Sequence, residues 1–201
     1  MPLPRFFICC HSTNKDLELL RKSTKKSIPP YQLQDQILWG KVVSVYDGDT
    51  FTVNLWQPKL QQFFQYTARC QGYDSPEMKP AKSMENREYW IDQAYEVRNL
   101  LAEWLTGIPF YSGMEKVPHL SKVEMEKKIE DNANPLLISV YCGKWDKYGR
   151  LLVDIPFDAK RMYWSETKWG PLRANTIASA LLLTGMVHPY EGGMKEEFHM
   201  N

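Results

Sequence analysis

Residues 41–55 read KVVSVYDGDTFTVNL, two alternating apolar and polar runs on either side of Asp47-Gly48. Both runs are rich in β-branched and aromatic residues, which favours strands. An Asp-Gly pair between two such runs is a strong signal for a tight hairpin. The stretch therefore predicts the first two strands of an antiparallel sheet, with Asp49 at the point where the second strand begins.

The chain beyond this hairpin continues the sheet and then adds helices. Three further segments have strand character: FFQYTARC at 63–70, LLISVYC at 136–142 and RLLVDIPF at 150–157. Apolar residues recur at helical spacing over 84–105, and we expect Ser83 to cap this helix and Gly107 to end it. A second apolar helix is expected over 174–185, ending at Gly185.

This order of strands and helices predicts an α+β fold that is mainly β. We expect a five-stranded oligonucleotide/oligosaccharide-binding (OB) barrel with helices packed on it. Residues 1–35 are expected to form a flexible N-terminal extension, and residues 36–198 the domain. Within the domain, residues 107–134 are interpreted as an insertion that carries a short exposed helix, since Ser121 and Glu124 have capping-box spacing.

The composition narrows the class of protein. The 25 Lys and Arg residues nearly balance the 24 Asp and Glu residues, which disfavours a generic nucleic-acid coat protein but not a focused basic site. The cysteines have no CxxC spacing, so reduced thiols are favoured over disulfides. No apolar run approaches the roughly 20 residues of a membrane span, and no signal peptide is evident. We therefore expect an intracellular monomer without a membrane span.

Three short motifs stand out because of the groups they supply together. They are DGDT at 47–50, RCQGYDSPE at 69–77 and DKYGR at 146–150. Each alone is typical of a turn. Together they offer Asp49 and Asp74, whose hard carboxylate oxygens suit Ca²⁺ or Mg²⁺ rather than zinc or copper.

The same motifs supply groups that bind and attack a phosphodiester. Arg69 and Arg150 can each direct two N–H groups at phosphate oxygens. Glu77 follows Asp74 closely enough to take a proton from a bound water. These residues together are the set that phosphodiester hydrolysis requires.

The three motifs, in this order and spacing, resemble the staphylococcal nuclease family. The resemblance covers about residues 37–198 and includes a Gly-x-x-x-Pro-Tyr-x-Gly-Gly-x-Lys run over 185–195. It implies a calcium-dependent phosphodiesterase (endonuclease or exonuclease) on an OB barrel. Its expected substrates are DNA, RNA or both, with single-stranded or unpaired regions favoured. Ser75 stands where the family commonly has Thr, and the chain has little of the family's usual last helix.

The resemblance also implies roles for individual residues. Asp49, Asp74 and the main-chain carbonyl of Ser75 would bind calcium. Arg69 and Arg150 would hold the scissile phosphate and stabilise the transition state, and Glu77 would activate or orient the attacking water. Four further positions are implied in supporting roles at the metal, a neighbouring phosphate or the nucleotide pocket: Asp47, Lys147, Tyr148 and Tyr190.

Three other interpretations of the sequence stay open at this point. The main alternative is a non-catalytic OB scaffold that binds nucleic acid or protein, although such scaffolds lack the catalytic groups that this chain keeps. A two-metal nuclease is suggested by Glu77-Met78-Lys79, but its ExK motif must lie on a strand, and Pro76 and Pro80 flank this one. The charged insertion at 107–134 could also serve as a partner-binding surface.

Overall fold

The computed structural model describes residues 13–27, 30–110, 116–157, 174–193 and 198. The chain divides into two compact units, Met1–Gln32 and Leu33–Asn201. In the first unit, helix α1 spans Asn14–Lys22 and begins with a capping box between Thr13 and Asp16. The second unit begins three residues before the predicted boundary, because the Leu33 side chain is fully buried in its core.

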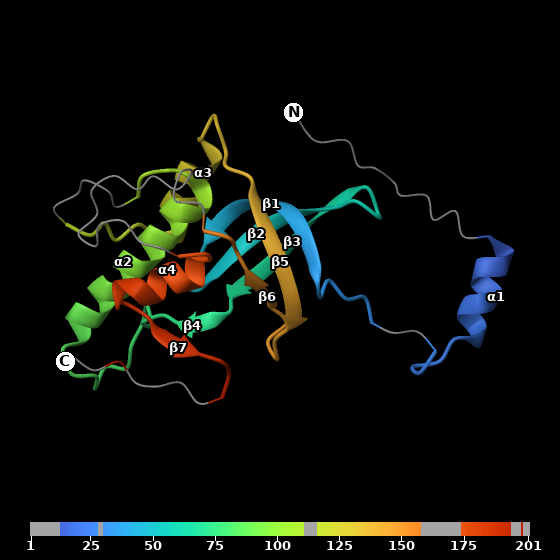
Figure 1. The fold of residues 1–201 in the computed structure, drawn as a ribbon, viewed down its shortest axis with the longest axis horizontal. Coiled ribbons are helices and arrows are strands. Elements are labelled where there is room, and N and C mark those ends of the chain that lie inside the picture. The colour runs from blue at the N-terminus through green and yellow to red at the C-terminus, as the bar shows by residue number, and fades with distance from the viewer. Residues whose placement is uncertain (1–12, 28–29, 111–115, 158–173, 194–197, 199–201) are drawn as a thin grey trace. The chain divides into compact units, whose positions relative to one another are not determined.

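The second unit is built on a closed five-stranded barrel (Figure 1). Its strands follow each other around the barrel in the order β1-β2-β3-β6-β5, with β3 and β6 parallel and the other pairs antiparallel. Their bounds are β1 Gln36–Val45, β2 Thr50–Gln57, β3 Gln62–Cys70, β5 Ile138–Trp145 and β6 Leu151–Asp154. The expected fold, an OB-type α+β barrel with helices packed on it, is confirmed.

Over much of the barrel strands, buried residues alternate with more exposed ones and enclose an apolar core. On β2, for example, Phe51, Val53 and Leu55 are fully buried, and the residues between them are partly exposed. This period of two is what the sequence pattern predicted.

Within the described part of the second unit, three helices accompany the barrel. They are α2 Arg87–Thr106, α3 Lys122–Glu130 and α4 Ile177–Thr184. Glycines in the left-handed conformation end two of them, Gly107 after α2 (φ 70°) and Gly185 after α4 (φ 72°), as predicted. No helix among the described residues is both long enough and apolar enough to pass through a membrane.

Two predictions about the helices are wrong in detail. Helix α2 does not begin at Ser83: its N-cap is Asn86, which has a left-handed backbone (φ 52°) and no side-chain cap. Helix α3 has the predicted capping box of Ser121 and Glu124, but it is not simply exposed. Its Met125 and Ile129 side chains are buried in the core, so this helix is part of the domain.

A small second sheet, absent from the sequence-based prediction, lies beside the barrel. Strand β4, Gly72–Asp74, pairs with β7, His188–Tyr190, near the C-terminal end of the described chain. Figure 1 shows the two strands together next to α4. Because β4 directly follows β3, this sheet brings the C-terminal segment to the end of the barrel where the first two motifs lie.

Candidate active site

The first motif forms the turn between β1 and β2. The Asp47 carboxylate accepts hydrogen bonds from the backbone N–H groups of Asp49 (3.1 Å) and Thr50 (2.7 Å), which is the bonding of an Asx turn. The direct effect of Asp47 is thus to shape the turn that presents Asp49.

Gly48 lets the first motif pack against the second. A Cβ atom at this position would lie 2.7 Å from Ser75 Cβ and 2.6 Å from a methyl group of Val97 on α2. The Tyr73 hydroxyl also donates a hydrogen bond to the Gly48 carbonyl, at 2.8 Å. The turn at 47–50 therefore packs closely against the segment at 73–75, and any residue larger than glycine at position 48 would prevent this contact.

Arg69 joins the carboxylates of the two motifs. Its Nη2 lies 2.8 Å from Asp49 Oδ2 and 2.8 Å from Asp74 Oδ1, and all three side chains are almost fully buried. The other terminal nitrogen, Nη1, donates to the carbonyls of Cys70 (3.1 Å) and Tyr73 (3.4 Å). The sequence predicted that Asp49 and Asp74 share one site, but not that Arg69 forms ion pairs with both carboxylates.

Thr50 connects this cluster to the third motif. Its hydroxyl donates to Asp49 Oδ1 at 2.6 Å and accepts from Arg150 Nη1 at 3.2 Å. Arg150 is 100 residues further along the chain, so the barrel closure between distant strands is what makes this contact possible. The Arg150 side chain is 26% exposed, which leaves it accessible to a ligand from solvent.

Asp146 holds Arg150 in place. Its carboxylate accepts hydrogen bonds from Arg150 Nε (2.7 Å), from the Arg150 backbone N–H (2.8 Å) and from the Tyr148 backbone N–H (2.8 Å). Burial alone would raise the pKa of Asp146, but these hydrogen bonds and the Arg150 charge outweigh burial and lower it. Asp146 is thus a positioning residue that we did not identify from the sequence, although an Asp at the start of a turn is a common signal for such bonds.

Two tyrosines lie against the arginines. The Arg69 guanidinium is 5.1 Å from the Tyr190 ring centre, and Arg150 is 5.4 Å from that of Tyr148. Lys147 Nζ is 5.0 Å from the same Tyr148 ring, which is 72% exposed. These cation–π contacts place two of the four expected supporting residues, Tyr190 and Tyr148, next to the arginines, and Lys147 next to Tyr148.

The remaining expected residues follow Asp74. Ser75 is buried beside Gly48. Glu77, the expected base, is exposed on the loop that follows β4.

The arrangement is compatible with a hard divalent cation. Two carboxylate oxygens converge on one point, now bonded to Arg69 Nη2 at 2.8 Å each, and carboxylate oxygens are preferred ligands of Ca²⁺. No group of three or more His, Cys, Asp or Glu side chains within the described ranges forms a metal cage. The remaining ligands of Ca²⁺ would therefore come from backbone carbonyls, water and substrate, and Arg69 would share its two carboxylates with the ion.

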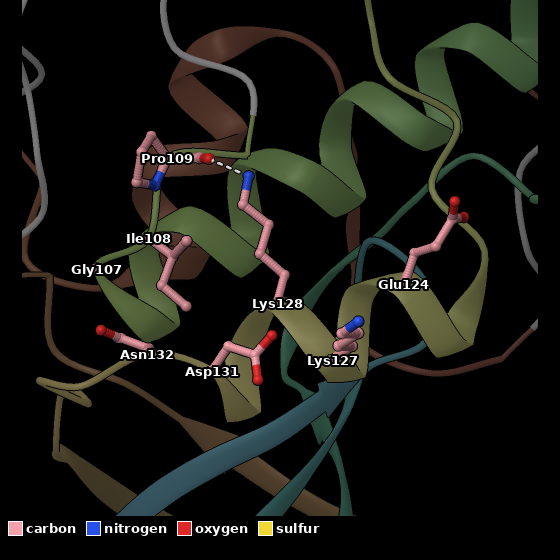
Figure 2. Close-up of a pocket in the computed structure, with 8 residues that line it drawn as sticks. All are labelled: Gly107, Ile108, Pro109, Glu124, Lys127, Lys128, Asp131 and Asn132. Carbon is pink, nitrogen blue, oxygen red and sulfur yellow. Dashed lines mark hydrogen bonds between the residues drawn. The ribbon is translucent and has the colours of Figure 1, made fainter.

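A pocket of about 430 Å³ lies away from these residues, between the end of α2 and helix α3. Figure 2 shows Lys128 of α3 reaching the Pro109 carbonyl, with an Nζ–O distance of 2.6 Å. The pocket has two lysines and two acids, so its lining favours neither anions nor cations. The Lys128 contact joins helix α3 to the segment that directly follows α2, within the insertion.

Comparison of the chain with protein-family models and with curated proteins finds no match to either. The interpretation of the site therefore depends on its own geometry.

Proposed function

We propose that the chain is a calcium-dependent phosphodiesterase that hydrolyses DNA, RNA or both. The observation that carries the proposal is the convergence of three motifs, separated by up to 100 residues, on one buried network. In that network, Arg69 bridges Asp49 and Asp74, and Thr50 bridges Asp49 and Arg150. A structural salt bridge alone would not require a second arginine, held by its own carboxylate, at the same end of the barrel.

The two arginines would bind the scissile phosphate. Arg150 is fixed by Asp146 and partly open to solvent, so its guanidinium is oriented before a ligand arrives. Fixed N–H donors aimed at developing negative charge are typically the largest contribution to such catalysis, about 3–4 kcal/mol for each donor. Arg69 would supply the second positive charge from inside the barrel end.

Asp49 and Asp74 would hold the calcium ion, together with the Ser75 carbonyl. When bound, the ion would supply positive charge that neutralises phosphate oxygens and lowers the pKa of a coordinated water. Thr50 would fix the orientation of Asp49 through its 2.6 Å hydrogen bond.

Glu77 would accept the proton of the attacking water. In this reaction the water oxygen bonds to phosphorus, one bridging P–O bond breaks and the leaving oxygen takes a proton from solvent. Glu77 is exposed, which suits a group that exchanges protons with solvent after each cycle. Tyr190 and Tyr148, next to the two arginines, would contact the sugar and base on either side of the phosphate.

The proposal is tested by incubating the purified chain with single-stranded DNA and RNA, with Ca²⁺ or with a chelator. We expect cleavage only with Ca²⁺, and loss of that cleavage in Asp49→Asn and Asp74→Asn variants. Binding of nucleic acid without cleavage by the wild-type chain would instead support the non-catalytic scaffold. Cleavage that persists in chelator would contradict the role of the two carboxylates.

A further inference from the structure

Helix α1, in the first compact unit, exposes its apolar side chains. No residue of this nine-residue helix is buried. Leu17, Leu19 and Leu20 are 39%, 60% and 67% exposed. An isolated helix shorter than about 12 residues is only marginally stable in water. A helix of this length therefore gains most of its stability from a surface that covers its apolar side.

The three leucines lie on one side of the helix, which we call the leucine face. Successive residues of an α-helix are turned by about 100°, which places the leucines within an arc of roughly 160°. Glu18 lies opposite the middle of this arc. Asp16 lies within the arc, but its carboxylate accepts hydrogen bonds from the Thr13 N–H (3.0 Å) and hydroxyl (2.6 Å) at the start of the helix. The remainder of the leucine face is apolar.

Positive charges border the leucine face on both sides. The cations are Lys15, Arg21 and Lys22 on the helix, and Lys25 and Lys26 in the turn that follows it. At about 100° per residue, Arg21 lies next to Leu17 at one border, and Lys22 lies near Leu19 at the other. All five cations are exposed, and none forms a salt bridge with another residue that the structure describes.

The net charge of the first unit is opposite in sign to that of the second. The first unit has six Lys and Arg against two Asp and Glu, a net charge of +4 with His neutral. The second unit has 19 Lys and Arg against 22 Asp and Glu, a net charge of −3. Positive charge is thus concentrated in the unit that carries the exposed leucines. This combination is typical of a helix that lies at the interface of a bilayer containing anionic lipids.

Other kinds of ligand would use only part of this surface. Nucleic acid binds Lys and Arg through its phosphates, but its phosphate backbone offers no apolar cover for the leucines. A protein groove that accepts the leucines does not require cations at both borders. A bilayer uses both features, because leucine side chains enter the boundary between headgroups and acyl chains while Lys and Arg side chains extend to the lipid phosphates.

We propose that α1 binds a membrane surface that contains anionic lipids, with the leucine face at the headgroup–acyl boundary and the bordering cations at the lipid phosphates. The nine residues of the helix extend over about 14 Å, less than the hydrocarbon core of about 30 Å. The helix therefore lies in the plane of the surface and does not cross it. This inference is independent of the proposed phosphodiesterase function.

The test measures co-sedimentation of the full chain with lipid vesicles in the presence of a chelator. One set of vesicles is phosphatidylcholine alone, and the other contains about 30% phosphatidylserine. A Leu17→Gln, Leu20→Gln variant removes most of the leucine face and keeps the helix, because Gln and Leu have similar helix propensities. The matched control is Leu183→Gln, which replaces a leucine of α4 that is 56% exposed.

We expect the wild type to bind the anionic vesicles at least tenfold more tightly, in order of magnitude, than the neutral ones. The double leucine variant should bind the anionic vesicles about tenfold or more weakly than the wild type. An Arg21→Gln, Lys22→Gln variant should lose roughly tenfold or more as well. Leu183→Gln should bind like the wild type, and all variants should keep its melting temperature because the replaced side chains are exposed.

Three results would overturn the inference. The first is a wild type that does not bind the anionic vesicles, or that binds them no better than the double leucine variant does. The second is affinity for a single-stranded oligonucleotide that falls in the Arg21→Gln, Lys22→Gln variant, without vesicle binding, which assigns α1 to nucleic acid. The third is a wild-type dimer that the double leucine variant converts to a monomer, without vesicle binding, which assigns the leucine face to self-association. Cleavage enters none of these measurements, so the phosphodiesterase proposal stands or fails separately.

Discussion

Replacing Arg69 by Met should destabilise the fold and, at the same time, make its stability depend on calcium. The guanidinium is the shared partner of two buried carboxylates, with both N–O distances at 2.8 Å. Met keeps much of the apolar stem but removes the charge, leaving Asp49 and Asp74 buried together as like charges. Removing one partner of a buried ion pair costs about 3–5 kcal/mol.

The size of the effect follows from the size of the domain. For a domain of this length, 1 kcal/mol corresponds to roughly 2–4 °C in melting temperature. We therefore expect Arg69→Met to melt roughly 6–20 °C below the wild type in chelator. Because a cation between the two carboxylates can replace the missing charge, added Ca²⁺ should raise the melting temperature of the variant more than that of the wild type.

The matched control removes all three charges. A variant with Arg69→Met, Asp49→Asn and Asp74→Asn has no uncompensated charge, so it should melt well above the single variant and should not respond to Ca²⁺. Thermal melts followed by circular dichroism, with Ca²⁺ and with chelator, give all six values. A single variant within 2 °C of the wild type in chelator, or equal calcium shifts in both, would refute this electrostatic account of the site.

Three further substitutions and treatments test other contacts. Gly48→Ala should lower the free energy of unfolding, measured in denaturant titrations, by about 1–3 kcal/mol. The added Cβ would lie only 2.6–2.7 Å from side-chain atoms of Val97 and Ser75. An unfolding free energy equal to that of the wild type would show that the two motifs are not tightly packed. Asp146→Asn should lower cleavage, because Arg150 loses the carboxylate that holds it. The folded-state pKa of Asp146 is lowered, so the stability that this carboxylate adds should be present at neutral pH and be lost as pH falls through the lowered pKa. In acid melts, the melting temperatures of wild type and variant should therefore become equal at low pH. Burial raises the pKa of Cys70 to about 12 and of Cys142 to about 11. At pH 8 a thiol reagent should therefore label these two cysteines far more slowly in the native than in the unfolded chain. Fast labelling of either cysteine in the native chain would contradict its burial.

The sequence predicted the barrel because the deciding signals are local. Alternation over each strand and the Asp-Gly turn are visible in short windows, and the strand order then leaves few topologies. The meeting of Asp49, Asp74 and Arg150 was expected from their positions at strand ends and turns. No sequence pattern predicts that Arg69 binds both carboxylates, because that contact depends on the paths of three separate segments.

The errors have equally specific causes. Ser83 resembles an N-cap, but residues 81–84 form a turn and Asn86, a residue that tolerates the left-handed conformation, precedes the helix. Strands β4 and β7 have three residues each, too few to show a period of two. Because most residues of α3 are charged, the sequence predicted an exposed helix, and the two side chains that are buried, Met125 and Ile129, were not recognised.

Gly48 illustrates a further limit of sequence reasoning. In the sequence it is half of a hairpin signal, which requires only a tight turn. In the structure its small size also matters because Ser75 and Val97 lie against it. Gly48 therefore serves both the local turn and the contact between the first and second motifs.

The most direct test of the central claim is the rate at which Arg150→Ala cleaves single-stranded DNA and RNA with saturating Ca²⁺. Lys144→Ala, which removes an exposed cation from β5, is the matched control. If Arg150 stabilises the transition state at the site described here, its loss should slow cleavage by about two or more decades, while the control cleaves like the wild type. Equal rates in all three proteins, or no calcium-dependent cleavage by the wild type, would contradict the claim that these three motifs form a nuclease site.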